Sequence, residues 1–228
     1  MRLALIGKEI GHSRSPYLYQ KILGPKVIYD LIDVEKNQLP LLSTLAATYD
    51  GLNITSPYKE HYLDQVKIED DLVLALGAIN TIELKSANYL ATNTDLIAVR
   101  SLLKNYKSQH TRIHIVLLGT GVMARVISLV AKELDISIAS LGRKSHPDMS
   151  SLDLKSFESS SAQNLVINAC SRDFVFQGAV DPNAIFWDLN YHFLPHQNTL
   201  PFIVKEYHDG QEMLFLQAKA AVMFWNKN

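Results

Sequence analysis

Apolar and polar residues alternate along the chain in blocks that predict strands and helices in turn. The first block, Leu3–Gly7, is a short apolar run typical of a buried strand, and Ser15–Leu23 follows with a helical pattern. Further apolar runs predict strands at 27–34, 51–55, 79–84 and 89–92, a helix at 39–49 and a hairpin turn around 86–88. Strands and helices that alternate in this way predict an α/β fold.

A second series of elements is expected after residue 94. A helical pattern runs from Thr94 to Tyr106, and we interpret the polar stretch 107–111 as a domain boundary. The run 113–118 is apolar almost throughout, which is typical of a parallel strand covered on both faces. After it the sequence predicts a glycine turn and an apolar helix. Strands are expected at 136–141, 165–169 and 184–189. A short helix is expected in the serine-rich stretch 150–162, and a closing helix at 211–225.

Composition narrows the range of functions. A chain of 228 residues with 47% hydrophobic and 20% charged residues can bury a sizeable core. Its net charge of -1 gives no attraction for nucleic acid or an anionic membrane, so we expect a small-molecule substrate and neither of those partners. The single cysteine, Cys170, fits a reducing compartment, and the first apolar run is too short for a signal peptide or a membrane span. We therefore expect a cytoplasmic protein.

A glycine turn is the first candidate binding element. Gly119-Thr120-Gly121 directly follows a predicted strand and opens a predicted helix, where a backbone without side chains can approach a pyrophosphate at the helix N-terminus. The third glycine of the usual pattern is replaced by Ala124, and a plain strand-to-helix turn is the alternative. At the end of the next strand stand Arg143 and Lys144 with no carboxylate, which favours NADP over NAD, the alternative being a solvated basic turn.

Three polar residues lie in separate loops that each follow a strand-like run. Lys59 close to Asp95 could relay a proton to or from a substrate hydroxyl, and Asn80 could contact the substrate. Each also has an ordinary structural interpretation: Lys59 as a surface charge, Asn80 as a turn residue and Asp95 as the capping residue of a helix. On the residues alone, the structural interpretations are the better ones.

Three other groups of residues have an ordinary structural interpretation or predict no site. Ser15 before Pro16 is typical of a helix N-cap, although Ser13 and Ser15 together would also suit a substrate carboxylate. His192 and His196 are four residues apart, but Pro195 should interrupt a helix there, so no metal site is predicted. Cys170 is interpreted as a small buried residue beside the cofactor and not as a nucleophile.

Taken in order, these motifs resemble those of the shikimate dehydrogenase family over essentially the whole chain. Seven short motifs in fixed order carry the resemblance: Gly7-x-x-x-x-His12-Ser13-x-Ser15-Pro16, Gly51-Leu-Asn53-Ile-Thr55-Ser-Pro57-Tyr-Lys59, Gly77-Ala-Ile-Asn80-Thr81, Asn93-Thr94-Asp95, Ile167-Asn168-Ala169-Cys170-Ser171, Asp188-Leu-Asn-Tyr191 and Gln211-Glu-Met213-Leu214-Phe-Leu-Gln217-Ala218.

The resemblance implies a fold and an activity. We expect an N-terminal mixed-sheet substrate domain, 1–98, a Rossmann-type NADP-binding domain, 99–210, and a closing helix, 211–228, that returns to the first domain. The implied reaction is the reversible, NADP-dependent reduction of 3-dehydroshikimate to shikimate in aromatic amino-acid biosynthesis, by an oxidoreductase acting on a CH–OH group. The implied roles are catalysis by Lys59 and Asp95, substrate binding by Ser13, Ser15, Thr55, Asn80, Tyr191 and Gln217, and cofactor binding by Gly119, Thr120, Gly121, Arg143, Lys144 and Met213.

The chain departs from the family pattern at three places. It has Tyr19-Gln20 where the family commonly has a His-Asn pair, Val122 in place of a second glycine, and Gly142 in place of an asparagine. Two alternative functions remain: a dehydrogenase for quinate or another cyclic hydroxy acid, and a ligand-sensing relative without turnover. The presence of both Lys59 and Asp95 favours an enzyme, expected as a monomer or a homodimer.

Overall fold

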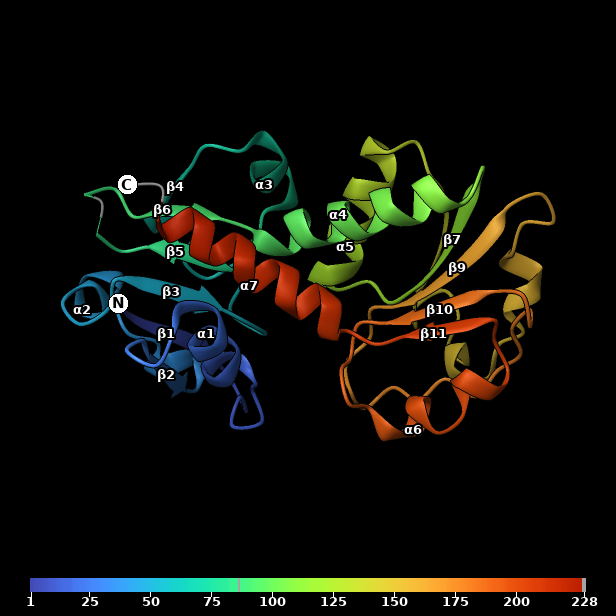
Figure 1. Cartoon of the computed structure of the whole chain (residues 1–228), viewed down its shortest axis with the longest axis horizontal. Helices are drawn as coiled ribbons and strands as arrows, with labels where there is room; N and C mark the ends of the chain where they lie inside the picture. The colour runs from blue at the N-terminus through green and yellow to red at the C-terminus, as the bar shows by residue number, and fades with distance from the viewer. Residues whose placement is uncertain (86, 227–228) are drawn as a thin grey trace. The chain divides into compact units, whose positions relative to one another are not determined.

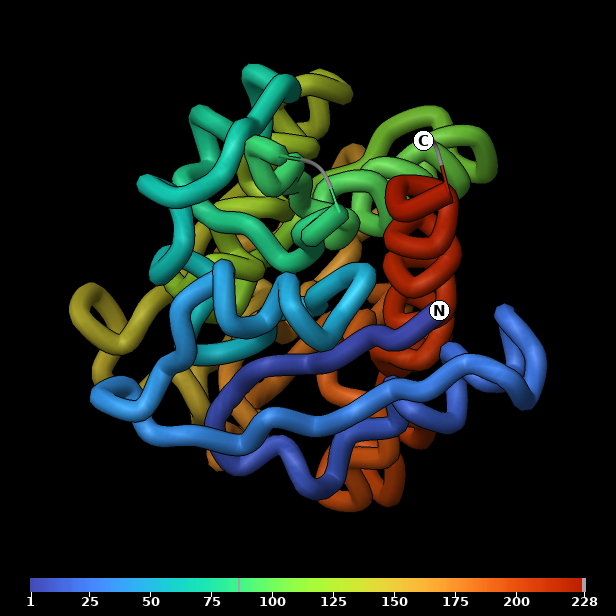
Figure 2. Tube along the Cα trace, turned by 90° about the vertical axis from the view of Figure 1, so that its left-hand side faces the viewer, coloured from blue at the N-terminus to red at the C-terminus, as the bar shows by residue number. Residues whose placement is uncertain are grey.

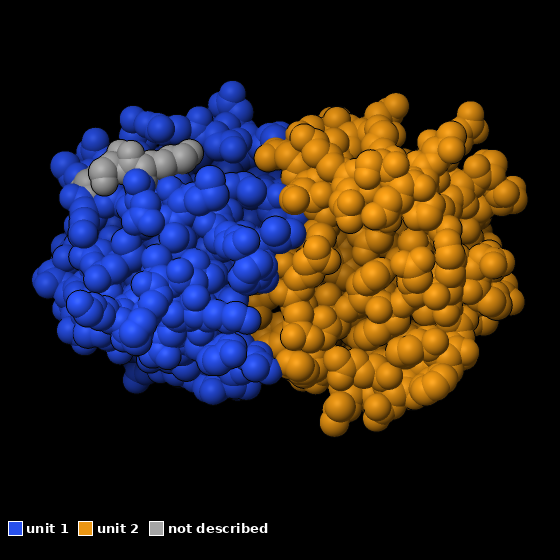
Figure 3. Space-filling model, in the orientation of Figure 1, with its two compact units in different colours: residues 1–98, 215–228 blue, residues 99–214 orange. Residues whose placement is uncertain are grey.

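A computed structural model describes residues 1–85 and 87–226 (Figure 1). The chain folds into two compact units (Figure 3). Unit 1 comprises residues 1–98 and 215–228, and unit 2 comprises residues 99–214. Each unit is built around its own sheet. The predicted hairpin turn around 86–88 includes Ser86, which lies outside the described residues.

The sheet of unit 1 is mixed. Its strands lie in the order β2-β1-β3-β5-β6-β4. The first three are parallel, β5 runs antiparallel to both β3 and β6, and β4 is parallel to β6. The bounds are β1 Arg2–Gly7, β2 Ile28–Asp33, β3 Gly51–Ile54, β4 Lys67–Ile68, β5 Thr81–Glu83 and β6 Leu90–Thr92.

A buried cluster joins both ends of the chain within unit 1. Residues of β1 and α1 pack against the last turns of the C-terminal helix, which lies beside the N-terminal strand in Figure 2. The indole of Trp225 donates a hydrogen bond to the carbonyl of Ile82 at 2.8 Å, and a methyl group on Gly51 would lie 2.5 Å from that indole. The helices of this unit are α1 Ser15–Leu23, α2 Leu42–Ala46, α3 Asp71–Leu76 and the first residues of α4 Thr94–Gln109, with most of α7 Gln211–Trp225.

The sheet of unit 2 is parallel throughout, with the order β11-β10-β9-β7-β8. The chain passes from β7 to β8 and then crosses to β9 on the other side of β7, so the winding direction reverses between β7 and β9. Ligands of such sheets bind beyond the carboxyl ends of the strands at this reversal. The elements are β7 Ile113–Leu118, α5 Val122–Glu133, β8 Ser137–Leu141, β9 Gln163–Asn168, β10 Ile185–Asp188, α6 Leu194–Gln197 and β11 Glu206–His208.

The α/β fold predicted from the sequence is confirmed, with a mixed sheet first, a parallel sheet second and a closing helix whose larger part belongs to unit 1. Among the described residues, no helix combines the length and the apolarity that a membrane span needs.

Several predicted elements were wrong in extent or kind. The helix expected at 39–49 spans only α2, because Leu39 precedes Pro40 and is held in an extended conformation (φ -60°, ψ 123°). The stretch 150–162 forms no α-helix. It contains the end of one short 3₁₀ helix, 149–151, and the whole of another, 154–157. The polar stretch 107–111 is mostly helix, since α4 continues to Gln109. Pro195 lies in the first turn of α6, where proline is tolerated, so it does not interrupt that helix.

Candidate active site

Lys59 and Asp95 form an ion pair in unit 1. The Lys59 Nζ atom lies 2.7 Å from the Asp95 Oδ2 atom, and the two side chains are only 14% and 8% exposed. The backbone of the loop after β3 is also fixed, because the carbonyl of Lys59 accepts a hydrogen bond from the Ile79 amide at 2.8 Å. Lys59 is therefore not a solvated surface charge, and that interpretation was wrong.

The Asp95 carboxylate can pair with Lys59 because Asn93 caps helix α4. The Oδ1 atom of Asn93 accepts hydrogen bonds from the backbone amides of Asp95 at 3.0 Å and Leu96 at 3.4 Å. Its Nδ2 atom donates to the carbonyl of Ala78 at 2.9 Å, and the whole residue is buried. Asn93 thus takes the capping role that the sequence suggests for Asp95, and the Asp95 carboxylate is directed to the lysine.

Several hydrogen bonds converge on the buried side chain of Asn80, so its interpretation as a simple turn residue was also wrong. It is 3% exposed, and its Oδ1 atom accepts hydrogen bonds from the Thr94 amide at 2.7 Å, the Thr94 hydroxyl at 3.1 Å and the Thr81 hydroxyl at 3.0 Å. The Thr94 hydroxyl also donates to the Gln217 Oε1 atom of α7 at 3.3 Å. This bond places Gln217, which is 123 positions from Thr94 in the sequence, beside the first turn of α4, which carries Asp95.

This network is extended by Asn53 and Tyr29, which were not predicted as site residues. Asn53, 5% exposed on β3, donates to the Thr81 hydroxyl at 3.1 Å and to the Asn80 carbonyl at 3.2 Å. It accepts a hydrogen bond from the Tyr29 hydroxyl at 2.8 Å. A polar residue in the middle of an otherwise apolar strand was the available signal for Asn53, since buried polar side chains are usually hydrogen-bonded.

Tyr19 replaces the usual family histidine and stacks on Tyr29, with ring centroids 4.5 Å apart and an angle of 14° between the rings. Burial raises the pKa of both hydroxyls, and for Tyr19 the nearby Asn53 amide opposes that rise in part. The Tyr19 hydroxyl is buried and has no hydrogen-bond partner within bonding distance among the described residues. The substitution therefore fills the core beside the site with an aromatic ring.

Ser13 and Ser15 face each other at the start of α1. The two hydroxyl oxygens are 3.2 Å apart, and the Ser15 amide donates to the Ser13 hydroxyl oxygen at 3.2 Å. The helix begins at Ser15 and its N-cap is Arg14, which has no side-chain capping bond, so the N-cap interpretation of Ser15 was wrong. Thr55, half-buried after β3, is fixed by the bond from its amide to the Ile6 carbonyl at 3.0 Å.

The glycine turn of unit 2 lies at the reversal point of the parallel sheet. Gly119 has a φ of +117°, which side-chain-bearing residues rarely adopt, and a methyl group there would lie 3.1 Å from the carbonyl of Ala169. Gly121 differs, because a methyl group on it would contact nothing within 4 Å. The N-terminus of α5 has neither a side-chain cap nor an acidic residue in its first turn. These features fit an anion such as a pyrophosphate, held by backbone amides and the helix dipole.

Arg143 and Lys144 are exposed in the turn after β8. This turn is ordered by the Gly142 carbonyl, which accepts hydrogen bonds from the backbone amides of Ser145 at 3.1 Å and His146 at 2.8 Å. A methyl group on Gly142 would lie 2.4 Å from the Thr120 Cγ2 atom. Gly142, where the chain departs from the family pattern, therefore leaves the space that the Thr120 side chain of the phosphate turn occupies.

Comparison with known proteins agrees with the resemblance. The family model described as the shikimate dehydrogenase substrate binding domain matches residues 5–82. A protein of Exiguobacterium named shikimate dehydrogenase (NADP(+)) is 34% identical over 146 residues, covering 60% of this chain and 54% of the relative. A Clostridium botulinum protein of the same name is 27% identical over 252 aligned positions, covering 98% of this chain and 96% of the relative. The first alignment thus spans about half the length of that relative, whereas the second spans nearly all of it.

The crystal structure of shikimate dehydrogenase from Aquifex aeolicus has the same fold, with a TM-score of 0.77 and 19% identity over 100% of this chain and 93% of that one. The chain is therefore similar to shikimate dehydrogenases along nearly its whole length, and the family model covers its first third. The match of residues 5–82 falls on unit 1 and includes Ser13, Ser15, Lys59 and Asn80.

The residues to which the shikimate dehydrogenase resemblance gives roles are divided between the two units. Lys59, Asp95, Asn80 and Gln217 belong to unit 1, where the described hydrogen bonds connect Asn80 with Gln217 through Thr94, and Lys59 with Asp95. Ser13, Ser15 and Thr55 also belong to unit 1. The cofactor residues predicted from the sequence, including the buried Met213, all belong to unit 2, as does the half-buried Tyr191.

Proposed function

We propose that this chain catalyses the reversible, NADP-dependent reduction of 3-dehydroshikimate to shikimate. The observation that carries the proposal is the largely buried Lys59–Asp95 pair at 2.7 Å, set among amide and hydroxyl side chains that suit a polyhydroxylated substrate. The names of the Exiguobacterium and Clostridium relatives support the same reaction and the same cofactor.

The reaction requires one hydride and one proton, and the protein handles the proton. When bound, NADPH supplies the hydride to the carbonyl carbon of the substrate. The Lys59 ammonium donates a proton to the carbonyl oxygen, which becomes the hydroxyl of shikimate, and the resulting amine takes a new proton from solvent. The Asp95 carboxylate orients the Lys59 amino group through the 2.7 Å contact. In the reverse direction the amine form of Lys59 accepts the hydroxyl proton.

Substrate recognition is assigned to the polar side chains of unit 1. The hydroxyls of Ser13 and Ser15 donate to the substrate carboxylate, as hydrogen bonds to a charged group are stronger than those between neutral groups. The amide oxygen of Asn80 accepts three hydrogen bonds inside the protein, so its amide nitrogen is the atom that donates to a ring hydroxyl. Gln217 and Thr55 complete the set of hydroxyl contacts in unit 1, and Tyr191, to which the family resemblance gives a substrate-binding role, belongs to unit 2.

Cofactor binding is assigned to unit 2. The turn Gly119-Thr120-Gly121 and the N-terminus of α5 hold the pyrophosphate. Arg143 and Lys144 hold the 2′-phosphate of NADP, which an NAD molecule lacks. Met213 packs near the nicotinamide, as the family resemblance implies.

The proposal also covers the cellular location, the oligomeric state and the alternative functions. We propose a cytoplasmic location, because a single cysteine fits a reducing compartment. The chain acts as a monomer or a homodimer. The alternative substrate is quinate or another cyclic hydroxy acid, and the alternative without turnover is a ligand sensor; the presence of the Lys59–Asp95 pair favours catalysis over sensing.

The proposal is tested by following the oxidation of NADPH with 3-dehydroshikimate, with NADH as the control for the cofactor and the oxidised form of quinate as the control for the substrate. We expect rapid oxidation of NADPH by 3-dehydroshikimate and slower reactions in both controls. Faster reaction with the quinate-derived ketone would support the alternative substrate. Binding of shikimate and NADP+ without any oxidation of NADPH would contradict the proposal and identify a sensor.

A further inference from the structure

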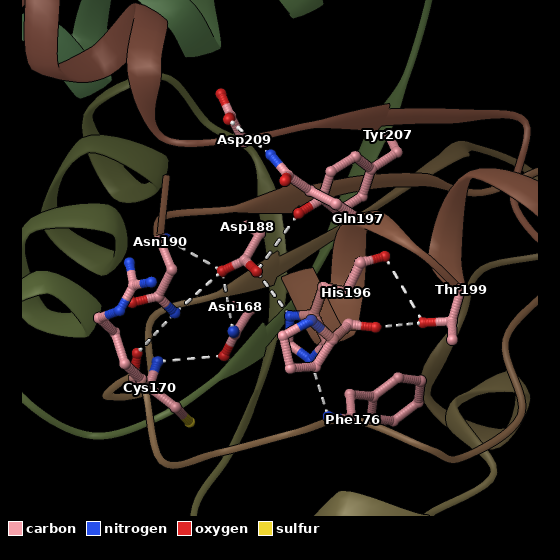
Figure 4. Close-up of polar contacts among 12 residues, drawn as sticks. Asn168, Cys170, Phe176, Asp188, Asn190, His196, Gln197, Thr199, Tyr207 and Asp209 are labelled. Atoms are coloured by element: carbon pink, nitrogen blue, oxygen red, sulfur yellow. Dashed lines mark hydrogen bonds and ion pairs between the residues drawn. The ribbon is translucent and has the colours of Figure 1, made fainter. Parts of the chain in front are cut away.

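Asp188, the last residue of β10, is the centre of a buried polar network in unit 2 (Figure 4). It is fully buried, and its Oδ1 atom accepts hydrogen bonds from the Asn168 side chain at 3.0 Å and from both the backbone and the side chain of Asn190, at 3.0 and 3.1 Å. Its Oδ2 atom lies 2.5 Å from the Nδ1 atom of His196 and 3.5 Å from the Tyr207 hydroxyl. A buried carboxylate requires such a set of donors, since an unpaired charge is costly to remove from water.

The contacts of His196 define its protonation state. The backbone amide of Phe176 donates to the Nε2 atom of His196 at 2.8 Å, so this nitrogen must act as an acceptor and carries no proton. The Nδ1 atom therefore carries the proton and donates it to Asp188. His196 is fully buried, and its two nitrogens have separate roles, since Nδ1 holds Asp188 and Nε2 holds the chain at Phe176.

The network extends from Asp188 to the phosphate turn. Asn168 accepts a hydrogen bond from the Cys170 amide at 3.1 Å, and Asn190 donates to the Cys170 carbonyl at 3.3 Å. The backbone at 169–170 is the surface that Gly119 contacts, because a methyl group on Gly119 would lie 3.1 Å from the Ala169 carbonyl and 3.3 Å from the Cys170 amide nitrogen.

The glycine turn is also bonded to the end of β8, because the Gly119 amide donates a hydrogen bond to the Leu141 carbonyl at 2.9 Å. Burial raises the pKa of the Cys170 thiol to about 11, and the Arg143 guanidinium opposes that rise. The loop that the network holds therefore lies against the glycine turn, and the glycine turn is bonded to Leu141, two residues before Arg143.

We propose that His196 is a positioning residue for the dinucleotide. Its Nδ1–H holds the Asp188 carboxylate, and Asp188, through Asn168 and Asn190, holds the Cys170 loop against the Gly119 turn in the conformation that receives the pyrophosphate. The inference rests on the proposed function for the identity of the dinucleotide, NADP. His196 acts through Asp188 and does not itself touch the cofactor.

A matched pair of substitutions separates the two roles of His196. In His196→Asn the side-chain amide lies near the former Nδ1 position and can still donate to Asp188, but the Phe176 amide loses its acceptor. In His196→Gln the amide oxygen reaches the former Nε2 position and can still accept from Phe176, but the donor to Asp188 is lost. Asparagine also leaves the larger cavity, so His196→Asn is expected to be the less stable variant.

The measurements are the dissociation constant of NADP+ and the temperature of unfolding for the wild-type protein and both variants. We expect His196→Gln to bind NADP+ about tenfold more weakly, the change expected when one hydrogen bond to a charged group is lost, and His196→Asn to remain within about threefold of the wild type. The less stable variant is thus the better binder. Equal affinities in the two variants, or affinities that fall in the same order as stability, would overturn the inference.

Asn190→Ala is a second test in case the buried position does not tolerate either variant. Asn190 is half-buried, and its side chain joins Asp188 to the Cys170 carbonyl without contacting His196 in the described network. We expect weaker NADP+ binding, measured at a temperature where the variant is fully folded, and unchanged binding would overturn the inference. If the wild-type protein binds no NADP+, the cofactor assignment of the proposed function fails together with the inference. If the wild-type protein binds NADP+ and the variants bind it equally well, the inference alone fails.

Discussion

Gly121 offers a test in which stability and cofactor binding should change in opposite directions. Its backbone is extended, with φ -75° and ψ -170°, and a methyl group on it would contact nothing within 4 Å. Alanine can adopt this conformation without strain, so Gly121→Ala should stabilise the fold by about 0.4 to 1 kcal/mol through the lower entropy of the unfolded chain. For a chain of this size, that raises the unfolding temperature by roughly 1 to 4 °C.

The same methyl group occupies the space through which a pyrophosphate would approach the backbone. If one hydrogen bond to the phosphate is lost, NADP+ binding should weaken by roughly ten- to hundredfold. Gly119→Ala is the matched control, because at φ +117° and 3.1 Å from the Ala169 carbonyl it should lose both stability and binding. Calorimetric titration with NADP+ and thermal unfolding measure the two quantities. A Gly121→Ala protein that binds NADP+ as tightly as the wild type would refute the assignment of the phosphate site.

Three further experiments test other parts of the site. Arg143→Ala should raise the Michaelis constant for NADP while leaving that for NAD nearly unchanged, and equal efficiency of the wild-type protein with both cofactors would remove the basis for this role. Alanine at both Ser13 and Ser15 should weaken substrate binding by about 1.5 to 3 kcal/mol with little effect on NADP+ affinity, as measured by titration of each ligand; unchanged substrate binding would show that the two hydroxyls serve only the start of α1. Asn93→Ala should be less stable than Asn93→Ser by about 1 kcal/mol in denaturant unfolding, because serine can cap α4 and alanine cannot, and equal stability would mean that Asn93 is not the cap.

The phosphate turn and its sheet could be predicted because local pattern determines them. The run 113–118 is apolar except for His114, which is typical of a parallel strand, and Gly119 follows it at the position where the chain must turn. In the structure Gly119 has the positive φ that explains the residue, and the strand lies next to the reversal of the sheet.

The capping of α4 could not be predicted with the same certainty. Asn93 and Asp95 are both good capping residues, and the sequence does not show which one accepts the helix amides. The difference arises from tertiary contacts: Asn93 also donates to the Ala78 carbonyl, while Asp95 in the first turn of α4 is paired with Lys59 from the loop after β3. Such long-range bonds leave no periodic signal in the sequence.

The role of His196 was missed for a related reason. Its neighbour Pro195 suggested an interrupted helix, and the spacing from His192 suggested only a metal site to be excluded. The partners of His196 are Phe176 and Asp188, 20 and 8 positions away, and they meet it only when β10 and the loop after β9 are in place. Short elements such as β4 and β11 were missed because two or three residues are too few to show alternation.

The most direct test of the proposed chemistry is the turnover of Lys59→Met with 3-dehydroshikimate and NADPH, measured beside the affinities of that variant for shikimate and NADP+. Methionine keeps most of the side-chain volume but can neither donate nor accept the proton, and general acid–base catalysis of this kind contributes about 10² to 10⁴-fold. We expect kcat to fall by that factor while both affinities stay within a few-fold of the wild type. A Lys59→Met protein that reduces 3-dehydroshikimate at the wild-type rate would contradict both the mechanism and the position of the active site.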